Sequence, residues 1–384
     1  MVMVIKNVSA SELLNSILSE NAKLYGMPPP SNSGILEDWR TRGLITDSEY
    51  NEIDLMQKNA TSSSEYQDAD MYHSLERIFV RIAKSLNKTF GAATDDIVIP
   101  TFGSVYMNQF TAQVKKHHIA EDTILISTDY VVLFSNELIN FAGNLSKLIA
   151  EIVVYSDDSS GLLINKNKLM ESAIDNKRFK KAFCLILLDY FTDTTVTKEE
   201  YRYTLLVEDP HKFRLASVLT YSYLVFVLSH EYAHFSSEFP YVQYQINANM
   251  HEEIMADLVS YLATVDVLNE SGIALALVYI GIFLSLDSLI VIDRLNEMKF
   301  NIKKSSIDWD STHLPGKERR KLFKDFLTKG AHNSSALLEY IDTINEIIEM
   351  CLLEFEHLLG LVKDNNNEYS LTQLRSLIYY YYDY

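Results

Sequence analysis

The chain has 384 residues, a length that can bury a large hydrophobic core and allows more than one domain. It carries 52 acidic against 34 basic residues, and the net charge of -18 disfavours nucleic acid and anionic membranes as general partners. Two isolated cysteines exclude a disulfide framework and a cysteine-based zinc site, so we expect a reducing compartment and a cytoplasmic location.

The low content of 12 glycines and 7 prolines favours helix, and residues 1–95 are predicted to form helices with polar faces. Loops are expected at residues 27–34, which contain three consecutive prolines, and at residues 60–64, which are rich in serine. The apolar run at the N-terminus is brief and gives way to polar residues, so we expect no signal peptide.

Residues 96–134 differ from the preceding region because they are rich in Ile, Val, Phe and Thr, which is typical of strands. A small sheet is therefore predicted here, with apolar runs at residues 97–100, 110–114, 123–127 and 130–134. Helices are expected to dominate after this region. The predicted class is thus α+β and predominantly helical.

Residues 230–234 read His-Glu-Tyr-Ala-His and follow an uncharged stretch, residues 215–229. On a helix, positions four apart lie one above the other, so His230 and His234 can direct two imidazoles at one metal ion. The pattern is typical of metalloproteases, in which the intervening glutamate, here Glu231, acts as general base on a water. Two ordinary histidines are the alternative, but a buried helix must provide partners for all three side chains, and a metal ion would do so.

A second segment, residues 251–257, offers a third ligand. Glu253 and Asp257 are again four residues apart, so both carboxylates face the same way on a second helix. Catalytic zinc usually has three protein ligands and one open position, so Glu253 would complete a His2Glu set. We expect Asp257 to accept the remaining ring N–H of His230. A solvated acidic helix start is the alternative reading, and His251 is a minor alternative as third ligand.

Other zinc arrangements do not fit the chain. The metzincin pattern would require glycine and histidine where Ser237 and Pro240 stand, and the inverted H-x-x-E-H motif does not occur. With H-E-x-x-H and E-x-x-x-D, the chain resembles the gluzincin metallopeptidases, in particular the core shared by the HtpX-like heat-shock peptidases and the CaaX prenyl proteases. The resemblance implies a zincin-like fold with a small antiparallel sheet and an active-site helix.

Two further regions are similar to that core. Residues 108–114 and 123–129 look like its strands, and the resemblance implies that an edge strand pairs with an extended substrate peptide through the residues Asn108, Phe110 and Ala112. Residues 311–319 look like its Ser-Thr-His-Pro-Pro segment, with Leu314 in place of the first proline. For His313 and Arg319 the resemblance implies a place near the metal, where either would stabilise the oxyanion. A surface-loop histidine is the alternative for His313.

The expected domain organisation has three parts. They are an N-terminal helical region (1–95), a metallopeptidase domain (96–330) with an insertion at about 155–214, and a C-terminal helical region with a tyrosine-rich tail (331–384).

Apolar residues recur at spacings of four and three across residues 337–358. This seam could pair with a regulatory partner or a second copy, although packing on the protein's own core is favoured. The longest apolar stretch, residues 272–286, is too short for a membrane span and predicts a buried helix. The relatives named above are membrane-embedded, whereas here no membrane span is expected.

We therefore expect a zinc-dependent endopeptidase that hydrolyses an intracellular protein or peptide. Internal cleavage is favoured because the G-x-M-E-N motif of aminopeptidase-type gluzincins is absent. The protease could be latent, with the N-terminal helices or the 155–214 insertion covering the active site. The alternative is a non-catalytic interaction or sensor protein that retains the zincin fold.

Overall fold

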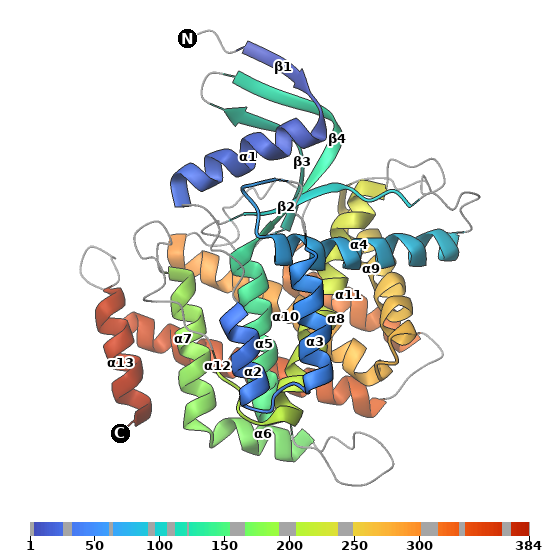
Figure 1. The fold of residues 1–384 in the computed structure, drawn as a ribbon. Helices are drawn as coiled ribbons and strands as arrows, with labels where there is room; N and C mark the ends of the chain where they lie inside the picture. Colours follow the sequence, from blue (N-terminus) through green and yellow to red (C-terminus); the bar gives the residue numbers. More distant parts are fainter. Residues whose placement is uncertain are drawn as a thin grey trace. The chain divides into compact units, whose positions relative to one another are not determined.

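The computed structural model describes residues 4–25, 33–60, 64–90, 97–105, 112–120, 123–153, 166–191, 205–236, 249–300, 314–329, 335–362 and 370–383. The fold is predominantly helical with one small sheet (Figure 1), which confirms the expected α+β class. Contacts divide the chain into two compact units. Unit 1 comprises Met1–Asn140, Glu208–Pro210 and Leu224–Ile273, and unit 2 comprises Phe141–Val207, His211–Tyr223 and Ala274–Tyr384. The expected boundaries near residues 95 and 330 stay a prediction.

Unit 1 contains the sheet and several helices, of which α1 and α4 contact the strands. Its elements are β1 (Val4–Val8), α1 (Ala10–Tyr25), α2 (Ser33–Thr41), α3 (Asp47–Lys58), α4 (Ala69–Phe90), β2 (Thr101–Val105), β3 (Ala112–Ala120), β4 (Thr123–Ser135), α9 (Asn249–Glu270) and the second half of α8 (Pro210–Ser236). Helix α5 (Asn136–Ile152) begins in this unit and continues into unit 2.

The sheet is mixed, and the expectation of an antiparallel sheet was wrong in this respect. The long strand β4 pairs in parallel with β1 along its first half and with β2 along its second half. On its other edge β4 pairs antiparallel with β3, across a connection of two residues that suits a hairpin. Parallel neighbours need long crossover connections, which the intervening helices provide here. Composition alone identified strands but not their directions.

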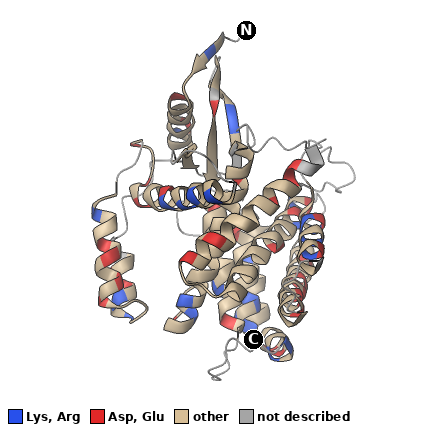
Figure 2. Ribbon diagram, turned by 90° about the vertical axis from the view of Figure 1, so that its right-hand side faces the viewer, with Lys and Arg blue, Asp and Glu red and all other residues tan. Residues whose placement is uncertain are grey.

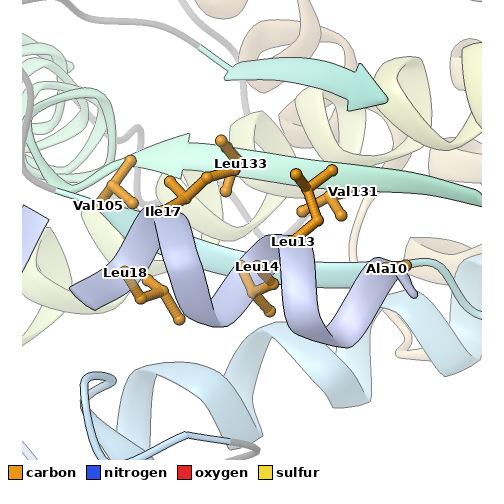
Figure 3. Close-up of a cluster of buried hydrophobic side chains, with 8 residues drawn as sticks. All are labelled: Ala10, Leu13, Leu14, Ile17, Leu18, Val105, Val131 and Leu133. Atoms are coloured by element: carbon orange, nitrogen blue, oxygen red, sulfur yellow. The ribbon is translucent and has the colours of Figure 1, made fainter. Parts of the chain in front are cut away.

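Helix α1 covers one face of the sheet (Figure 3). Ser9 and Glu12 form a capping box at its start, because the Ser9 hydroxyl accepts from the Glu12 N–H and the Glu12 carboxylate accepts from the Ser9 N–H at 2.8 Å. Apolar side chains recur at helical spacing and form one stripe. Figure 3 shows this stripe against β2 and β4, in a cluster of Ala10, Leu13, Leu14, Ile17, Leu18, Val105, Val131 and Leu133.

Helix α9 packs against α4 and is held there by hydrogen bonds from Arg81. The Arg81 guanidinium donates to the Val267 carbonyl at 2.8 Å and to the Ser271 hydroxyl at 2.7 Å. Past the end of α9, Gly272 has a φ of 70°, and the Ile273 N–H reaches back to the Leu268 carbonyl at 3.1 Å. A positive φ is easy only for glycine, so this residue ends the helix in a defined turn.

The described secondary-structure elements of unit 2 are all helices. Besides parts of α5 and α8 it contains α6 (Lys166–Ile174), α7 (Lys177–Phe191), α10 (Leu275–Phe300), α11 (Gly316–Lys329), α12 (Ser335–Leu361) and α13 (Leu371–Asp383). The seam predicted on residues 337–358 lies on α12, where Ile341, Ile344, Ile348, Cys351, Phe355 and Leu358 are buried. These side chains pack within unit 2, the arrangement that the sequence favoured.

Of the apolar stretch at residues 272–286, residues 275–286 lie in α10, and most of them are buried, as predicted. Within the described residues, α8 and α10 are long and apolar enough to cross a membrane by length and composition alone. Most of each apolar window is buried inside the protein, as in the core helices of soluble proteins, so the absence of a membrane span stays a prediction.

Acidic and basic residues are interspersed along individual helices (Figure 2). Many of them pair locally. In unit 2, Arg294 on α10 contacts Glu356 on α12 at 2.6 Å, and in unit 1, Lys88 on α4 contacts Asp266 on α9 at 3.2 Å. These exposed pairs each contribute little to stability, at most about 1 kcal/mol.

Candidate metal centre

The His-Glu-Tyr-Ala-His segment forms the last turns of α8, within unit 1. Its central residue holds the helix in place, because buried Tyr232 packs near Phe79 of α4 and donates its hydroxyl to the Val98 carbonyl at 2.7 Å. Tyr232 lies two positions from each histidine and therefore points to another side of the helix. This anchoring leaves His230 and His234 together on the face that meets α9.

Three possible metal ligands converge at this face. The Nε2 atoms of His230 and His234 are 3.1 Å apart. On α9, Oε2 of Glu253 lies 3.3 Å from Nε2 of His230, and Oε1 of Glu253 lies 3.3 Å from Nε2 of His234. His230 and Glu253 are buried, and His234 is partly buried. Within the described residues, this is the cluster whose donor atoms could hold a metal ion.

The other nitrogen of each imidazole meets a second carboxylate. Nδ1 of His230 lies 3.0 Å from Oδ1 of Asp257, the contact predicted from the sequence. Nδ1 of His234 lies 3.2 Å from Oε1 of Glu252. An ionised carboxylate can only accept a hydrogen bond, so a proton on each Nδ1 would satisfy both contacts and would leave the Nε2 atoms able to act as metal ligands.

With the protons on Nδ1, the arrangement would be electrostatically unfavourable unless a metal ion or a further proton lay between the donor atoms. Two Nε2 lone pairs and the Glu253 carboxylate face one another within hydrogen-bonding distance, in a mostly buried place where such repulsion is poorly screened. The spacing also suits zinc. Ligands about 2.0–2.1 Å from a tetrahedral ion lie roughly 3.3 Å from one another. The 3.1 Å between the two Nε2 atoms and the 3.3 Å from each of them to a Glu253 oxygen are near this value, so the three residues suit a zinc site that keeps a fourth position for water or substrate.

Glu231 is buried on α8, next in sequence to His230. A carboxylate at this position can act as a base toward a water at the fourth position. The structure therefore brings together four of the predicted site residues, His230, His234, Glu253 and Asp257, and adds a buried Glu231 beside them.

The remaining predicted residues either lie outside the described residues or belong to other elements. Asn108, Phe110 and His313 lie outside the described residues, as does the side chain of His251. Ala112 is the first residue of β3, opposite Phe134 of β4. Among the described strands β3 pairs with β4 alone and is therefore an edge strand. Arg319 lies on α11 in unit 2.

Glu252 is the contact that sequence reasoning missed. It directly precedes the predicted ligand Glu253, and no role was predicted for it from the sequence. Its position suggests the opposite side of the helix from Asp257, and only the placement of α9 beside α8 reveals its contact with His234. The only hint in the sequence was that Glu252 is a carboxylate residue next to a predicted metal ligand.

No protein-family model, curated protein or solved structure matches this chain. The resemblance to gluzincins therefore rests on the two motifs and on the arrangement of their side chains.

Proposed function

We propose that this chain is a zinc-dependent endopeptidase of the gluzincin type. The observation that carries the proposal is the convergence of His230, His234 and Glu253: the two Nε2 atoms lie 3.1 Å from each other and 3.3 Å each from one of the two Glu253 oxygens. Each histidine is turned toward the centre by a carboxylate on its other nitrogen. Such carboxylate–histidine pairs are the usual support of a protein zinc site.

When bound, zinc polarises a scissile carbonyl and lowers the pKa of a water, typically to about 7. Glu231 takes a proton from the attacking water and returns it to the leaving amine nitrogen. Asp257 keeps the proton of His230 on Nδ1, so that Nε2 remains available as a ligand. Burial of Glu253 excludes competing water from the ligand side of the site.

The substrate class follows from the chemistry and from the resemblance. The absence of the G-x-M-E-N motif favours internal cleavage of a protein or peptide. An extended substrate would pair with the edge strand β3, which begins at Ala112. Two cysteines with no disulfide fit a cytoplasmic protease.

Metal analysis of the purified full chain tests the site. We expect one equivalent of zinc in the natural protein and in Glu231→Gln, and loss of zinc in His234→Ala. His211→Ala is the matched control, because His211 is an exposed histidine on the same helix outside the motif. A natural protein without zinc, in which a proton occupies the space between the imidazoles, would support the non-catalytic alternative.

Cleavage profiling tests the activity. Peptides that appear when the natural chain is added to a cell extract, and that are absent with Glu231→Gln, would identify substrates and the cleaved bonds. We expect the Gln variant to lose activity by at least about 100-fold, the usual contribution of a general base. Equal cleavage by both proteins would remove Glu231 from the mechanism.

A further inference from the structure

The two histidines of the cluster are supported by carboxylates in different environments. Asp257, which contacts His230, has a side chain 5 % exposed, whereas Glu252, which contacts His234, is 49 % exposed. Both carboxylates come from α9, five residues apart in sequence. They therefore approach the cluster from different sides of the helix. Glu252 approaches it from the side that faces solvent.

The contact of Glu252 has a specific chemical meaning. Its Oε1 lies 3.2 Å from Nδ1 of His234, and the Nε2 of the same ring lies 3.1 Å from Nε2 of His230. A carboxylate at Nδ1 fixes the proton there and holds the ring plane, so that the lone pair on Nε2 points to the centre. Without this acceptor the partly exposed His234 ring can rotate or change tautomer.

We propose that Glu252 is a positioning residue that orients His234 as a metal ligand from the solvent side. This inference rests on the proposed zinc site and deepens it. Because Glu252 is half exposed, its attraction for the ring N–H is screened by water and salt, whereas the attraction of buried Asp257 is not. The protein therefore holds one histidine firmly and the other through a contact that responds to ionic strength.

Zinc affinity measured by chelator competition tests the role of Glu252 without any activity assay. We expect Glu252→Ala to weaken zinc binding about 10-fold, the lower end of the effect of removing a carboxylate behind a metal ligand. Glu252→Gln keeps a side-chain oxygen that can accept the N–H, so it should restore most of the lost affinity. A merely structural role would not be rescued through the hydrogen-bond acceptor.

Glu270→Ala provides the matched control. Glu270 is a carboxylate on the same helix with a similar exposure of 57 %, and its partner is Lys88 on α4. Its removal should leave zinc affinity unchanged. Raising the salt concentration from about 0.1 M to about 1 M shortens the screening length from about 10 Å to about 3 Å. This should reduce the difference in zinc affinity between the natural protein and Glu252→Ala.

The outcomes separate this inference from the proposed function. Zinc affinity of Glu252→Ala equal to that of the natural protein would overturn the role of Glu252 while leaving the site intact. Absence of zinc binding in the natural protein would overturn both. Should the alanine variant fail to fold by circular dichroism, Glu252→Lys replaces the acceptor by a cation at the same exposed position and should weaken binding further; unchanged affinity there would also refute the role.

Discussion

Asp257 is the residue whose contact determines which nitrogen of His230 faces the cluster. Its Oδ1 lies 3.0 Å from Nδ1 of the ring, and both side chains are buried. Removal of the carboxylate leaves a buried N–H without its acceptor, which costs about 1–3 kcal/mol. A buried pair is also poorly screened by salt. Asp257 should therefore matter more to the site than any exposed acidic residue of α9.

We expect Asp257→Ala to weaken zinc affinity by about 10- to 100-fold, because the ring of His230 loses its tautomer and orientation. Chelator competition measures this change. Asp266→Ala is the control, since Asp266 is on the same helix but pairs with Lys88. An Asp257 variant that binds zinc as tightly as the Asp266 variant would contradict the role assigned to this carboxylate.

Asp287 is a buried acid in the middle of α10, in unit 2. Its side chain is 1 % exposed and contacts the Arg320 guanidinium at 2.5 Å. Burial raises the pKa of Asp287 to about 7, despite the attraction of Arg320, and the nearby carboxylates Asp342 and Glu349 act in the same direction as burial. A folded-state pKa above the unfolded value makes the protonated acid the form that stabilises the fold.

The predicted pH dependence of stability follows from the upward direction of this pKa shift. As pH rises from about 4 to about 7, the unfolded chain releases the proton of Asp287 while the folded chain retains it, so the stability due to this group falls by up to about 4 kcal/mol and then levels off. Asp287→Asn does not titrate. Urea unfolding of both proteins at several pH values should show the natural protein losing stability relative to the variant over this range. A constant difference from pH 4 to pH 8 would show that Asp287 keeps an ordinary pKa.

The residues that could be named from the sequence are those that belong together because of their spacing along one helix. Histidines and carboxylates four positions apart must share a helix face, so His230, His234, Glu253 and Asp257 could be named before any fold was known. Glu252 could not, because its partner depends on how α9 lies beside α8. Asp287 was visible only as the charge that interrupts an apolar run, since its partner Arg320 lies 33 positions further along the chain.

The same distinction applies to secondary-structure elements. Strand β1 was missed because its five residues, Val-Ile-Lys-Asn-Val, pair with β4 more than a hundred positions away. Residues 97–100 were expected to be a strand, but the described strand β2 begins after them, at Thr101. Pro100 cannot donate to a neighbouring strand, which accounts for the later start. Helix α10 is 26 residues long, because its amphipathic second half extends the apolar run that the sequence revealed.

Helix α10 approaches the first half of α8 closely at Gly281. A Cβ atom placed there would lie 2.3 Å from Cβ of Ser222, so one helix would have to shift. We expect Gly281→Ala to destabilise the protein by about 1–3 kcal/mol through overpacking. Thermal unfolding monitored by circular dichroism measures the change.

Gly360 of α12 is the control for this substitution. Apart from the adjoining backbone of α12, no described atom lies within 4 Å of a Cβ placed at Gly360, so Gly360→Ala should leave stability unchanged or raise it slightly through helix propensity. Similar melting temperatures for the two alanine variants would contradict the close approach at Gly281.

The three candidate metal ligands all lie in unit 1. His230, His234 and Glu253 all lie in the Leu224–Ile273 stretch of unit 1, while α12 and α13 belong to unit 2. Zinc that binds the folded state stabilises it by about 2.7 kcal/mol at a hundred times its dissociation constant. Local opening near the ligands must release the metal and is therefore suppressed first.

Hydrogen exchange of the whole chain should reflect this localisation. Addition of zinc is expected to slow exchange of amides in residues 224–236 and 249–257, with little change in α13. His234→Ala should abolish the effect, and Glu231→Gln should preserve it. Protection that is equal in all helices, or that survives in His234→Ala, would indicate a metal site elsewhere.

The contacts among the side chains of the candidate centre join two helices, α8 and α9. Their geometry is encoded by two four-residue intervals and one helix pairing. Such an arrangement of side chains could be transferred to another protein. A designer could transfer six residues onto any rigid helical pair with the same spacing and test metal binding there, separately from every other property of this protein.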